Sequence, residues 1–436
     1  MLFKNISILD ENFEIKDNMF VATKGEFITY IGNSFPDEMD YGEIFNGEGT
    51  LLMPGFYNSH VHSPMSLMRG YGEGLQLHEW LYERIFPFET TLTEKDVYWG
   101  AMLSMAESMR FGIVSGNDMY FLTDGLAKAV IESGMKANIC RSVSNTTGLS
   151  PHNDPTYKEM VYTDKTYNGS GEGRVLVDAS LHAEYTNDVP TIRAVAKYAL
   201  YNDLNIHVHL AETKREVIEC KKRYQGLGPV ELFNINGVFD SPTIAAHCIF
   251  VDDNDRRIFK EKGVTVASCP VSNLKLASGI CDVCKLYDEG INVTIGTDGV
   301  SSNNSLNFFE EMKIFALLGK FKSMNPARMK PIEVLRSATI NGAKAQGREK
   351  CGSLKVGNRA DLIVLNISCP NMNPKNDLIC NIVYAASGND VRLTMVDGKV
   401  LYKDDEYYTL DIEKIKFEVE KRSSFKNINK IDNENN

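Results

Sequence analysis

The chain has 436 residues, 43% apolar and 24% charged, which is enough for one large globular domain or two. Its net charge of −11 argues against a nucleic-acid partner or an anionic membrane surface. No apolar run reaches the ~18 residues needed to span a bilayer, and the first residues lack the pattern of a signal peptide. Nine scattered cysteines, with Cys281 and Cys284 as one close pair, favour reduced thiols. We therefore expect a cytoplasmic protein, and the sequence leaves a homo-oligomer open.

Short strands and turns are predicted for residues 1–50, at 2–8, 19–23 and 27–32. From residue 51 the pattern changes, and apolar runs of strand length alternate with amphipathic helical stretches. The eight runs are 51–62, 112–120, 137–145, 174–182, 205–212, 243–250, 264–273 and 292–298. The helical stretches between them include 94–111, 125–133, 189–202, 214–224 and 253–262. This alternation predicts an α/β protein with a (β/α)8 TIM barrel, because apolar strands of this kind suit a parallel sheet buried on both faces.

The C-terminal part returns to β character after a predicted helix at 331–347. Strands are expected within 352–365 and 390–402, a last helix at 412–421, and a frayed polar tail at 427–436. We expect the two ends of the chain to form one small discontinuous β-sandwich domain beside the barrel. The predicted division is 1–52 for its N-terminal part, 53–350 for the barrel, and 351–436 for its C-terminal part.

Histidines and one aspartate stand at the ends of the strand-length runs. His60 and His62 are two residues apart, and residues i and i+2 of a strand point to the same face, so both imidazoles can reach one metal ion. His209, His247 and Asp298 each end a later run. Barrel enzymes place their chemistry at the C-terminal ends of the strands, so these side chains predict a catalytic metal site.

Three further residues near these ends need separate interpretation. His207 shares a strand face with His209, but His209 is nearer the strand end and is the better ligand candidate; His207 then becomes a core histidine or a support for a ligand. Glu212 lies three residues beyond His209, too far to bind the same ion but well placed for proton transfer. His182 ends the fourth run.

The ligand types indicate one divalent metal ion per chain. The run 174–182 has no internal lysine that could be modified to bridge two metals. Imidazole and carboxylate ligands suit zinc, with iron and manganese as the alternatives. Zinc lowers the pKa of a bound water to ~7, which makes hydroxide available at neutral pH.

Several stretches around these residues resemble the amidohydrolase superfamily, in its branch of aromatic-base aminohydrolases and chlorohydrolases. The stretches are NSHVHSPMSLMRG (58–70), EWL (79–81), FPFE (86–89), SNLKL (272–276), GTDG (296–299) and SSNNS (301–305). Within that branch the chain is most similar to the S-adenosylhomocysteine/5′-methylthioadenosine deaminases. The resemblance extends from residue 54 to residue 362 and implies the barrel fold.

The resemblance also implies a role for each matching residue. The positions that match the family's metal ligands are His60, His62, His209 and Asp298. The other matches are Glu212 for proton transfer, His247 with Asp298 for holding the water, Glu89 for the ribose, Arg141 on the substrate side, and His182 near the adenine. Two alternatives stay open: Glu89 could begin a helix, and Arg141 could be a structural ion-pair residue.

The implied reaction is metal-dependent hydrolytic deamination of the adenine ring of 5′-modified adenosines, giving inosine-type products and ammonia. One departure bears on the substrate. Members that accept S-adenosylhomocysteine are expected to carry a second arginine after strand three, but residues 148–158 contain none, and Lys158 offers a point charge rather than a fork. This favours 5′-methylthioadenosine, 5′-deoxyadenosine or adenosine over the homocysteine adduct. The alternatives are a guanine- or s-triazine-type aminohydrolase or chlorohydrolase, and a non-catalytic barrel.

Overall fold

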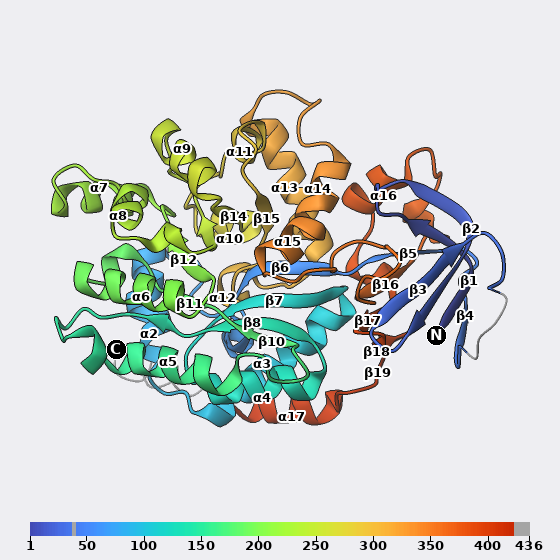
Figure 1. Ribbon diagram of the computed structural model, residues 1–436, viewed down its shortest axis with the longest axis horizontal. Helices are drawn as coiled ribbons and strands as arrows, with labels where there is room; N and C mark the ends of the chain where they lie inside the picture. The colour runs from blue at the N-terminus through green and yellow to red at the C-terminus, as the bar shows by residue number, and fades with distance from the viewer. Residues whose placement is uncertain (37–40, 423–436) are drawn as a thin grey trace.

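The protein is described by a computed structural model that covers residues 1–36 and 41–422 (Figure 1). It is an α/β protein with two sheets of parallel strands, flanked by helices, and a nine-stranded mixed sheet at one end. The four-stranded parallel sheet has the order β10-β8-β7-β6, and the six-stranded sheet has the order β15-β14-β13-β12-β11-β9. The α/β class expected from the sequence is confirmed.

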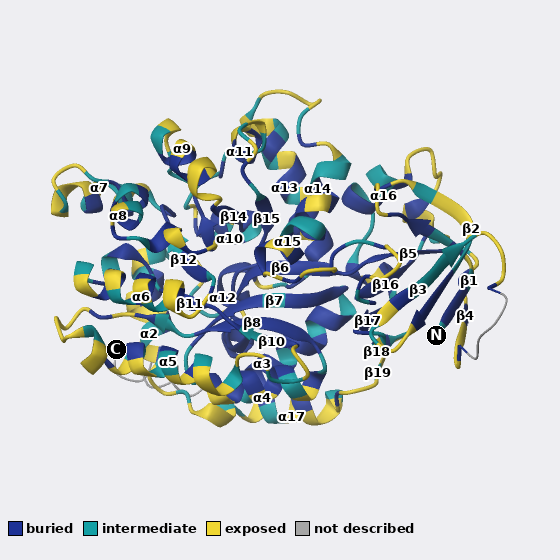
Figure 2. Ribbon diagram, in the orientation of Figure 1, coloured by how far each residue is buried: buried dark blue, intermediate teal, exposed yellow. Residues whose placement is uncertain are grey.

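Every strand-length run predicted after residue 50 contains at least one strand of these sheets. The strands are β6 (Phe56–Val61), β7 (Ile113–Met119), β8 (Lys136–Cys140), β9 (Ser142–Val143), β10 (Val175–Val177), β11 (Ala179–Leu181), β12 (Ile206–Leu210), β13 (Thr243–His247), β14 (Thr265–Ser268) and β15 (Val293–Ile295). Their residues are almost all buried (Figure 2), as expected for parallel strands covered on both faces.

The two parallel sheets are connected along the chain and across their edges. Single residues, Arg141 and Asp178, separate β8 from β9 and β10 from β11, so two strands pass from one sheet into the other. At the opposite edges β15 contacts β6, and the Asp298 N–H donates to the His60 carbonyl at 2.9 Å. The carboxyl ends of β6, β12, β13 and β15 therefore meet in one region.

Helices follow the strands, as the periodicity predicted. Those expected from the sequence are α3 (Glu94–Arg110), α4 (Thr123–Ser133), α6 (Val189–Tyr201), α7 (Lys214–Arg223) and α9 (Asp253–Lys262). Those not expected are α5 (Pro155–Tyr167), α8 (Pro229–Ile235), α10 (Pro270–Lys275), α11 (Val283–Asp288), α12 (Val300–Asn303) and α13 (Phe308–Lys322). Local chemistry sets their ends: in α9 the Asp252 side chain accepts N–H groups of the first turn, and Gly263 ends the helix at φ 68°.

The nine-stranded sheet combines both ends of the chain. Its strands are β1 (Leu2–Leu9), β2 (Ile15–Lys24), β3 (Phe27–Gly32), β4 (Ile44–Asn46), β5 (Thr50–Pro54), β16 (Leu362–Asn366), β17 (Val391–Val396), β18 (Lys399–Lys403) and β19 (Glu406–Tyr407). Strand β5 pairs with β1 on one side and with β16 on the other, which joins the two ends. The last helices, α16 (Leu378–Tyr384) and α17 (Ile412–Arg422), pack instead against α13 and α3. The predicted tail at 427–436 lies outside the described residues.

Four predicted elements were wrong in extent. The strand at 264–273 ends at Ser268, because Pro270 occupies the first turn of α10. The run 51–62 divides at Gly55 into β5 of the mixed sheet and β6 of a parallel sheet. The helix at 331–347 is two helices, α14 (Pro331–Ala338) and α15 (Ile340–Ala345), and residues 352–361 form turns before β16.

Among the described residues, no helix is both long and apolar enough to cross a membrane.

Candidate metal centre and active site

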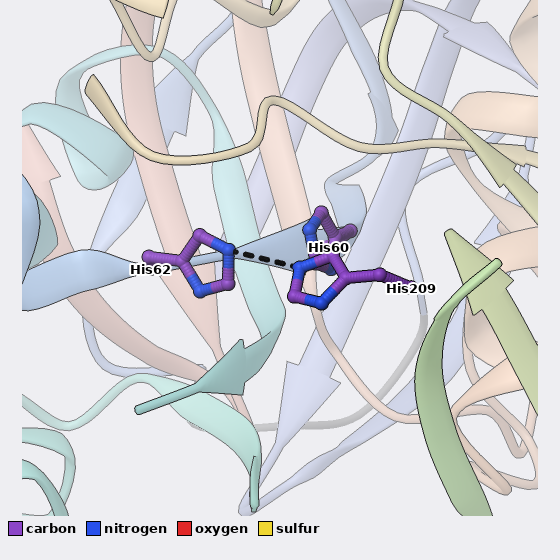
Figure 3. A group of neighbouring side chains, drawn as sticks. All are labelled: His60, His62 and His209. Carbon is purple, nitrogen blue, oxygen red and sulfur yellow. Dashed lines mark hydrogen bonds between the residues drawn. The ribbon is translucent and has the colours of Figure 1, made fainter. Parts of the chain in front are cut away.

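Three imidazoles from two strands converge where the parallel strands end (Figure 3). His60 lies on β6, His62 follows that strand directly, and His209 lies on β12. One ring nitrogen of each lies within 4.8 Å of the other two. The structure thus brings together three of the histidines that the sequence suggested as ligands.

His62 and His209 each form a hydrogen bond through Nδ1 to a backbone carbonyl, and their Nε2 atoms face each other. His62 Nδ1 lies 2.6 Å from the Met119 carbonyl oxygen, and His209 Nδ1 lies 2.8 Å from the His182 carbonyl oxygen. Since a carbonyl only accepts, each Nδ1 carries a proton, and in the neutral ring Nε2 then has the lone pair that can bind a metal. The two Nε2 atoms are 3.4 Å apart (Figure 3, dashed line). Two nitrogens bound tetrahedrally to zinc at about 2.0–2.1 Å stand ~3.4 Å apart, so this spacing fits a shared ion.

His60 completes the imidazole set. Its Nδ1 lies 3.0 Å from His207 Nε2, and His207 Nδ1 lies 3.6 Å from the Cys140 sulfur. Its Nε2 is buried and has no hydrogen-bond partner within the described part of the chain. Burial lowers the pKa of His60 to about 3, which keeps the ring in the neutral form that binds metals.

Asp298 supplies an anionic oxygen beside the imidazoles. Its Oδ1 lies 3.2 Å from His62 Nε2 and 3.6 Å from His60 Nε2. The other oxygen, Oδ2, accepts hydrogen bonds from Ser272 Oγ at 2.7 Å and Ser302 Oγ at 3.1 Å, which fixes the carboxylate. Burial keeps His60 and His209 neutral, whereas the Asp298 carboxylate, opposing the effect of burial, raises the pKa of His62. Three imidazoles and one oriented carboxylate fit a divalent cation by donor type, and a bound cation would displace any proton from His62 Nε2.

Glu212 and His247 lie beside this group and face each other. His247 Nε2 is 3.8 Å from Glu212 Oε2, and His247 Nδ1 is 2.8 Å from the amide oxygen of Asn273. Because Asn273 accepts at Nδ1, the Nε2 of the neutral ring can accept a hydrogen bond from water. Ser278 donates to Glu212 Oε1 at 3.1 Å, and burial raises the pKa of the Glu212 carboxyl. A carboxyl group with a raised pKa suits general acid–base chemistry near neutral pH.

A cavity of about 170 Å³ opens onto these side chains and contains the three predicted substrate residues in its wall. They are Glu89, Arg141 and His182. Burial raises the pKa of Glu89 to about 7, against the opposing effects of the Tyr120 hydroxyl, His62 and Arg141. Burial lowers the pKa of His182 to about 4, so this ring is neutral. The same cavity wall therefore contains the histidine–carboxylate cluster and the partly buried Glu89 carboxyl.

The segment that carries Glu89 was not predicted to be helical. It consists of α1 (Leu77–Glu79), a π-helical turn η2 (Trp80–Ile85) and α2 (Phe86–Glu89). π-helical turns are rare and are frequent at functional sites. Glu89 stands at the end of α2, whereas α3 begins later, capped by Thr93, so the helix-start alternative for Glu89 does not hold.

Arg141 has both a cavity position and an ion pair. Its Nε donates to Glu159 Oε2 at 2.5 Å, and its Nη1 donates to the Ser142 carbonyl oxygen. The ion-pair alternative raised by the sequence is therefore present in the structure, together with the exposure to the cavity. Lys158, the other cation considered, is exposed and does not contribute to the cavity wall.

Sequence reasoning missed several residues that position the site. The Tyr120 hydroxyl lines the cavity beside Glu89 and lowers the pKa of that carboxyl, opposing the effect of burial. Ser272, Asn273 and Ser302 were noted only as parts of similar stretches, yet they orient Asp298 and His247. Their position in polar stretches that directly follow the apolar runs could have indicated this role from the sequence.

The fold and the site define a metal-dependent hydrolase-type centre, and comparison with known proteins identifies its family. The model of the amidohydrolase family matches residues 51–401, and the chain belongs to this family. It is 39% identical to the 5-methylthioadenosine/S-adenosylhomocysteine deaminase of Dictyoglomus thermophilum over 97% of this chain and 98% of that protein. It is also 39% identical to the 5′-deoxyadenosine deaminase of Methanosarcina mazei, over 94% and 93%. A zinc-bound adenosine deaminase from Xanthomonas campestris has a similar structure, with a TM-score of 0.90 and 27% identity over 96% and 97% of the two chains.

The contact between His60 and His207 leads to a prediction about metal affinity. His207→Ala leaves the buried His60 Nδ1–H without an acceptor, and partners of metal ligands typically contribute ~10–100-fold to affinity. We expect zinc affinity, measured by competition with a chromogenic chelator, to fall by that factor. His207→Gln, whose amide oxygen can accept, should recover part of it, and His152→Ala at an exposed histidine is the control. Unchanged affinity in His207→Ala would show that this contact does not orient the ligand.

Proposed function

We propose that this protein deaminates the adenine ring of 5′-modified adenosines by hydrolysis, releasing ammonia and an inosine-type product. The observation that carries the proposal is one cavity whose wall contains the converging imidazole–carboxylate cluster, Glu212 and the partly buried Glu89. The named activities of the relatives support the same substrate class. The expected substrates are 5′-methylthioadenosine, 5′-deoxyadenosine and adenosine, with S-adenosylhomocysteine disfavoured.

One divalent metal ion per chain is part of this proposal, with zinc as the first choice and iron or manganese as alternatives. The proposed ligands are His60, His62, His209 and Asp298, for which the distances and tautomers given above are the support. A bound zinc ion would lower the pKa of a coordinated water to ~7 and so supply a nucleophile at neutral pH.

The chain's own residues would move the protons. We assign Glu212 to carry a proton from the attacking water to ring N1, since its carboxyl has a raised pKa and lies in the cavity wall. His247, with its Nδ1 held by Asn273, would accept a hydrogen bond from the water and orient it together with Asp298. The water oxygen bonds to C6, and one water proton passes through Glu212 to N1, where it stays in the product. The second water proton goes to the exocyclic amine, the C6–N bond breaks, ammonia leaves, and C6 becomes a carbonyl.

The substrate would be held from the other side of the cavity. Glu89 can accept hydrogen bonds from both vicinal ribose hydroxyls, because an ionised carboxylate has two acceptor oxygens. His182 would face the adenine, and Arg141 would lie toward the 5′ side. These assignments place the exocyclic amine near Glu212.

A guanine- or s-triazine-type hydrolase is the second candidate, since it would need the same metal centre. Such substrates lack a ribose and leave the buried Glu89 without a partner, which disfavours them. The deciding experiment measures ammonia release by zinc-loaded protein across nucleosides, free bases and triazines. Higher kcat/KM on guanine or a triazine than on every adenosine derivative would refute the nucleoside proposal.

We also propose that the two connected parallel sheets form one (β/α)8 barrel. Two observations support this closure. Strand β15 contacts β6, and β8 continues into β9, as β10 does into β11, from one sheet to the other after a single residue. The β-sandwich description of the terminal sheet and the division at residues 52 and 350 remain predictions, as do the cytoplasmic location and a homo-oligomeric state.

The raised pKa of Glu89 leads to a pH-dependent prediction. Above pH ~7 Glu89 is ionised and accepts from both hydroxyls, whereas below it one oxygen becomes a donor. Its charged or polar neighbours are Tyr120, His62 and Arg141. We expect the kcat/KM ratio of adenosine to 2′,3′-dideoxyadenosine to fall ~10-fold or more as pH drops from 8 to 5.5, since a hydrogen bond to a charged group contributes ~1.5–3 kcal/mol. Glu89→Gln should flatten this ratio, and a ratio independent of pH in the unaltered protein would exclude the assigned role.

A further inference from the structure

Arg141 is the one lysine or arginine among the described residues that line the substrate cavity. It lies on the same side of the cavity as Glu89, whose pKa it lowers. A cation at this place would by itself attract a negatively charged substituent on the nucleoside. Whether it does so depends on what else the guanidinium contacts.

Glu159, which does not line the cavity, already neutralises the Arg141 cation by an ion pair. Its Oε2 accepts from Arg141 Nε at 2.5 Å, and its Oε1 accepts from the backbone N–H of Leu122 at 3.0 Å. Both carboxylate oxygens are therefore engaged and the group is fixed. Arg141 is further held by its bond to the Ser142 carbonyl oxygen, which leaves the second hydrogen of Nη1 and both hydrogens of Nη2 as donors.

Glu159 is not part of the cavity wall, although it contacts a residue that is. It comes from α5, and its side chain is only partly exposed, at 31%. A substrate therefore meets Arg141 but not Glu159, and Glu159 can act on the substrate only through the charge and orientation of Arg141. This position also argues against Glu159 as a direct partner for the ammonium group of an amino-acid substituent.

We infer that Glu159 is a specificity-determining residue that cancels the charge of Arg141 and so restricts the cavity to nucleosides with an uncharged 5′ substituent. This rests on the proposed function. With Glu89 ionised, the side chains Glu89, Arg141 and Glu159 carry a net charge of −1, so an added carboxylate is repelled rather than neutralised. Glu159 is a positioning residue, because it acts through Arg141.

The test compares two substrates that differ in charge at the 5′ group. One is 5′-methylthioadenosine, and the other is a 5′-(2-carboxyethylthio) analogue, which has a carboxylate but no ammonium group. We expect Glu159→Gln to raise kcat/KM for the carboxylate analogue ~10-fold, mainly through a lower KM, because Arg141 is then free to pair with it. Activity on 5′-methylthioadenosine should stay within ~3-fold. The double variant Arg141→Gln/Glu159→Gln should lose the gain.

A matched control changes another arginine–glutamate pair. Glu289 accepts from Arg256 Nε at 2.8 Å, away from the cavity, and Glu289→Gln should leave both substrates and their ratio unchanged. If Glu159→Gln does not fold by thermal melting, Glu159→Ala removes the same charge and serves instead. S-adenosylhomocysteine, as a zwitterion, is a third substrate that reports any contribution of an ammonium group.

Three outcomes separate this inference from its alternatives. A substrate ratio unchanged by Glu159→Gln overturns it. A loss of activity confined to the carboxylate analogue or to S-adenosylhomocysteine also overturns it, since Glu159 would then hold Arg141 in place for an anion or bind an ammonium group. Failure of the unaltered, zinc-loaded protein to deaminate any adenosine derivative would instead refute the proposed function itself.

Discussion

Glu212→Gln should lower kcat on 5′-methylthioadenosine by ~10²–10⁴-fold, the usual contribution of general acid–base catalysis. The amide keeps the size of the side chain and its contact with Ser278, but it cannot take a proton from water and pass it to the ring. The buried position of Glu212 and its raised pKa are what equip the carboxyl for this transfer. Steady-state ammonia release gives the rate, and elemental analysis should show unchanged metal content.

Two controls make the result specific. Glu261→Gln alters an exposed glutamate of α9 and should leave kcat unchanged. The KM of Glu212→Gln should change much less than its kcat, because the residue acts on the reacting atoms rather than on the ribose. Turnover within ~3-fold of the unaltered protein would remove Glu212 from the assigned role, and a loss of bound metal would assign it to the metal centre instead.

The sequence predicted the α/β class and most strand positions because parallel strands buried on both faces are nearly continuous apolar runs. His60, His62, His209 and Asp298 could be selected together because each ends such a run, and the predicted barrel brings the carboxyl ends of its parallel strands to one face. In the structure these ends meet although β6 and β12 belong to two different sheets. The helices α3 and α9 could also be predicted, and both begin at a capping box, formed by Thr93 in α3 and by Asp252 in α9.

Other features depend on contacts between residues far apart in the sequence, which periodicity cannot show. The helical segment that carries Glu89 was missed because short helices and a π-helical turn have no strong 3.6-residue pattern. The prediction for 264–273 failed because an apolar run continued past the proline that starts α10. The ion pair of Arg141 with Glu159, 18 residues away, became visible only once α5 was placed beside β9.

Removal of the metal should abolish turnover and lower thermal stability together. The proposed ligands His60, His62, His209 and Asp298 bring three imidazole nitrogens and one carboxylate oxygen together, and a bound cation would stabilise this group in the folded state. After dialysis against a strong chelator we expect kcat to fall by at least ~10³-fold, since an ion that activates water supplies several kcal/mol and each tenfold corresponds to 1.36 kcal/mol. A ligand that binds the folded state at 100 times its Kd adds about 2.7 kcal/mol to stability, so Tm should fall by several degrees.

Titrating zinc back should restore activity in proportion to occupancy, with a break at about one ion per chain. His209→Ala should behave like the stripped protein at low zinc and should bind zinc at least ~100-fold more weakly, because it loses one of four proposed ligands. His78→Ala, at an exposed histidine outside the cluster, should keep the unaltered metal content. A break at two ions per chain, or full activity in His209→Ala without added zinc, would contradict the single-ion centre. The second group that could hold an ion, His60, His247 and Cys269, shares His60 with the first.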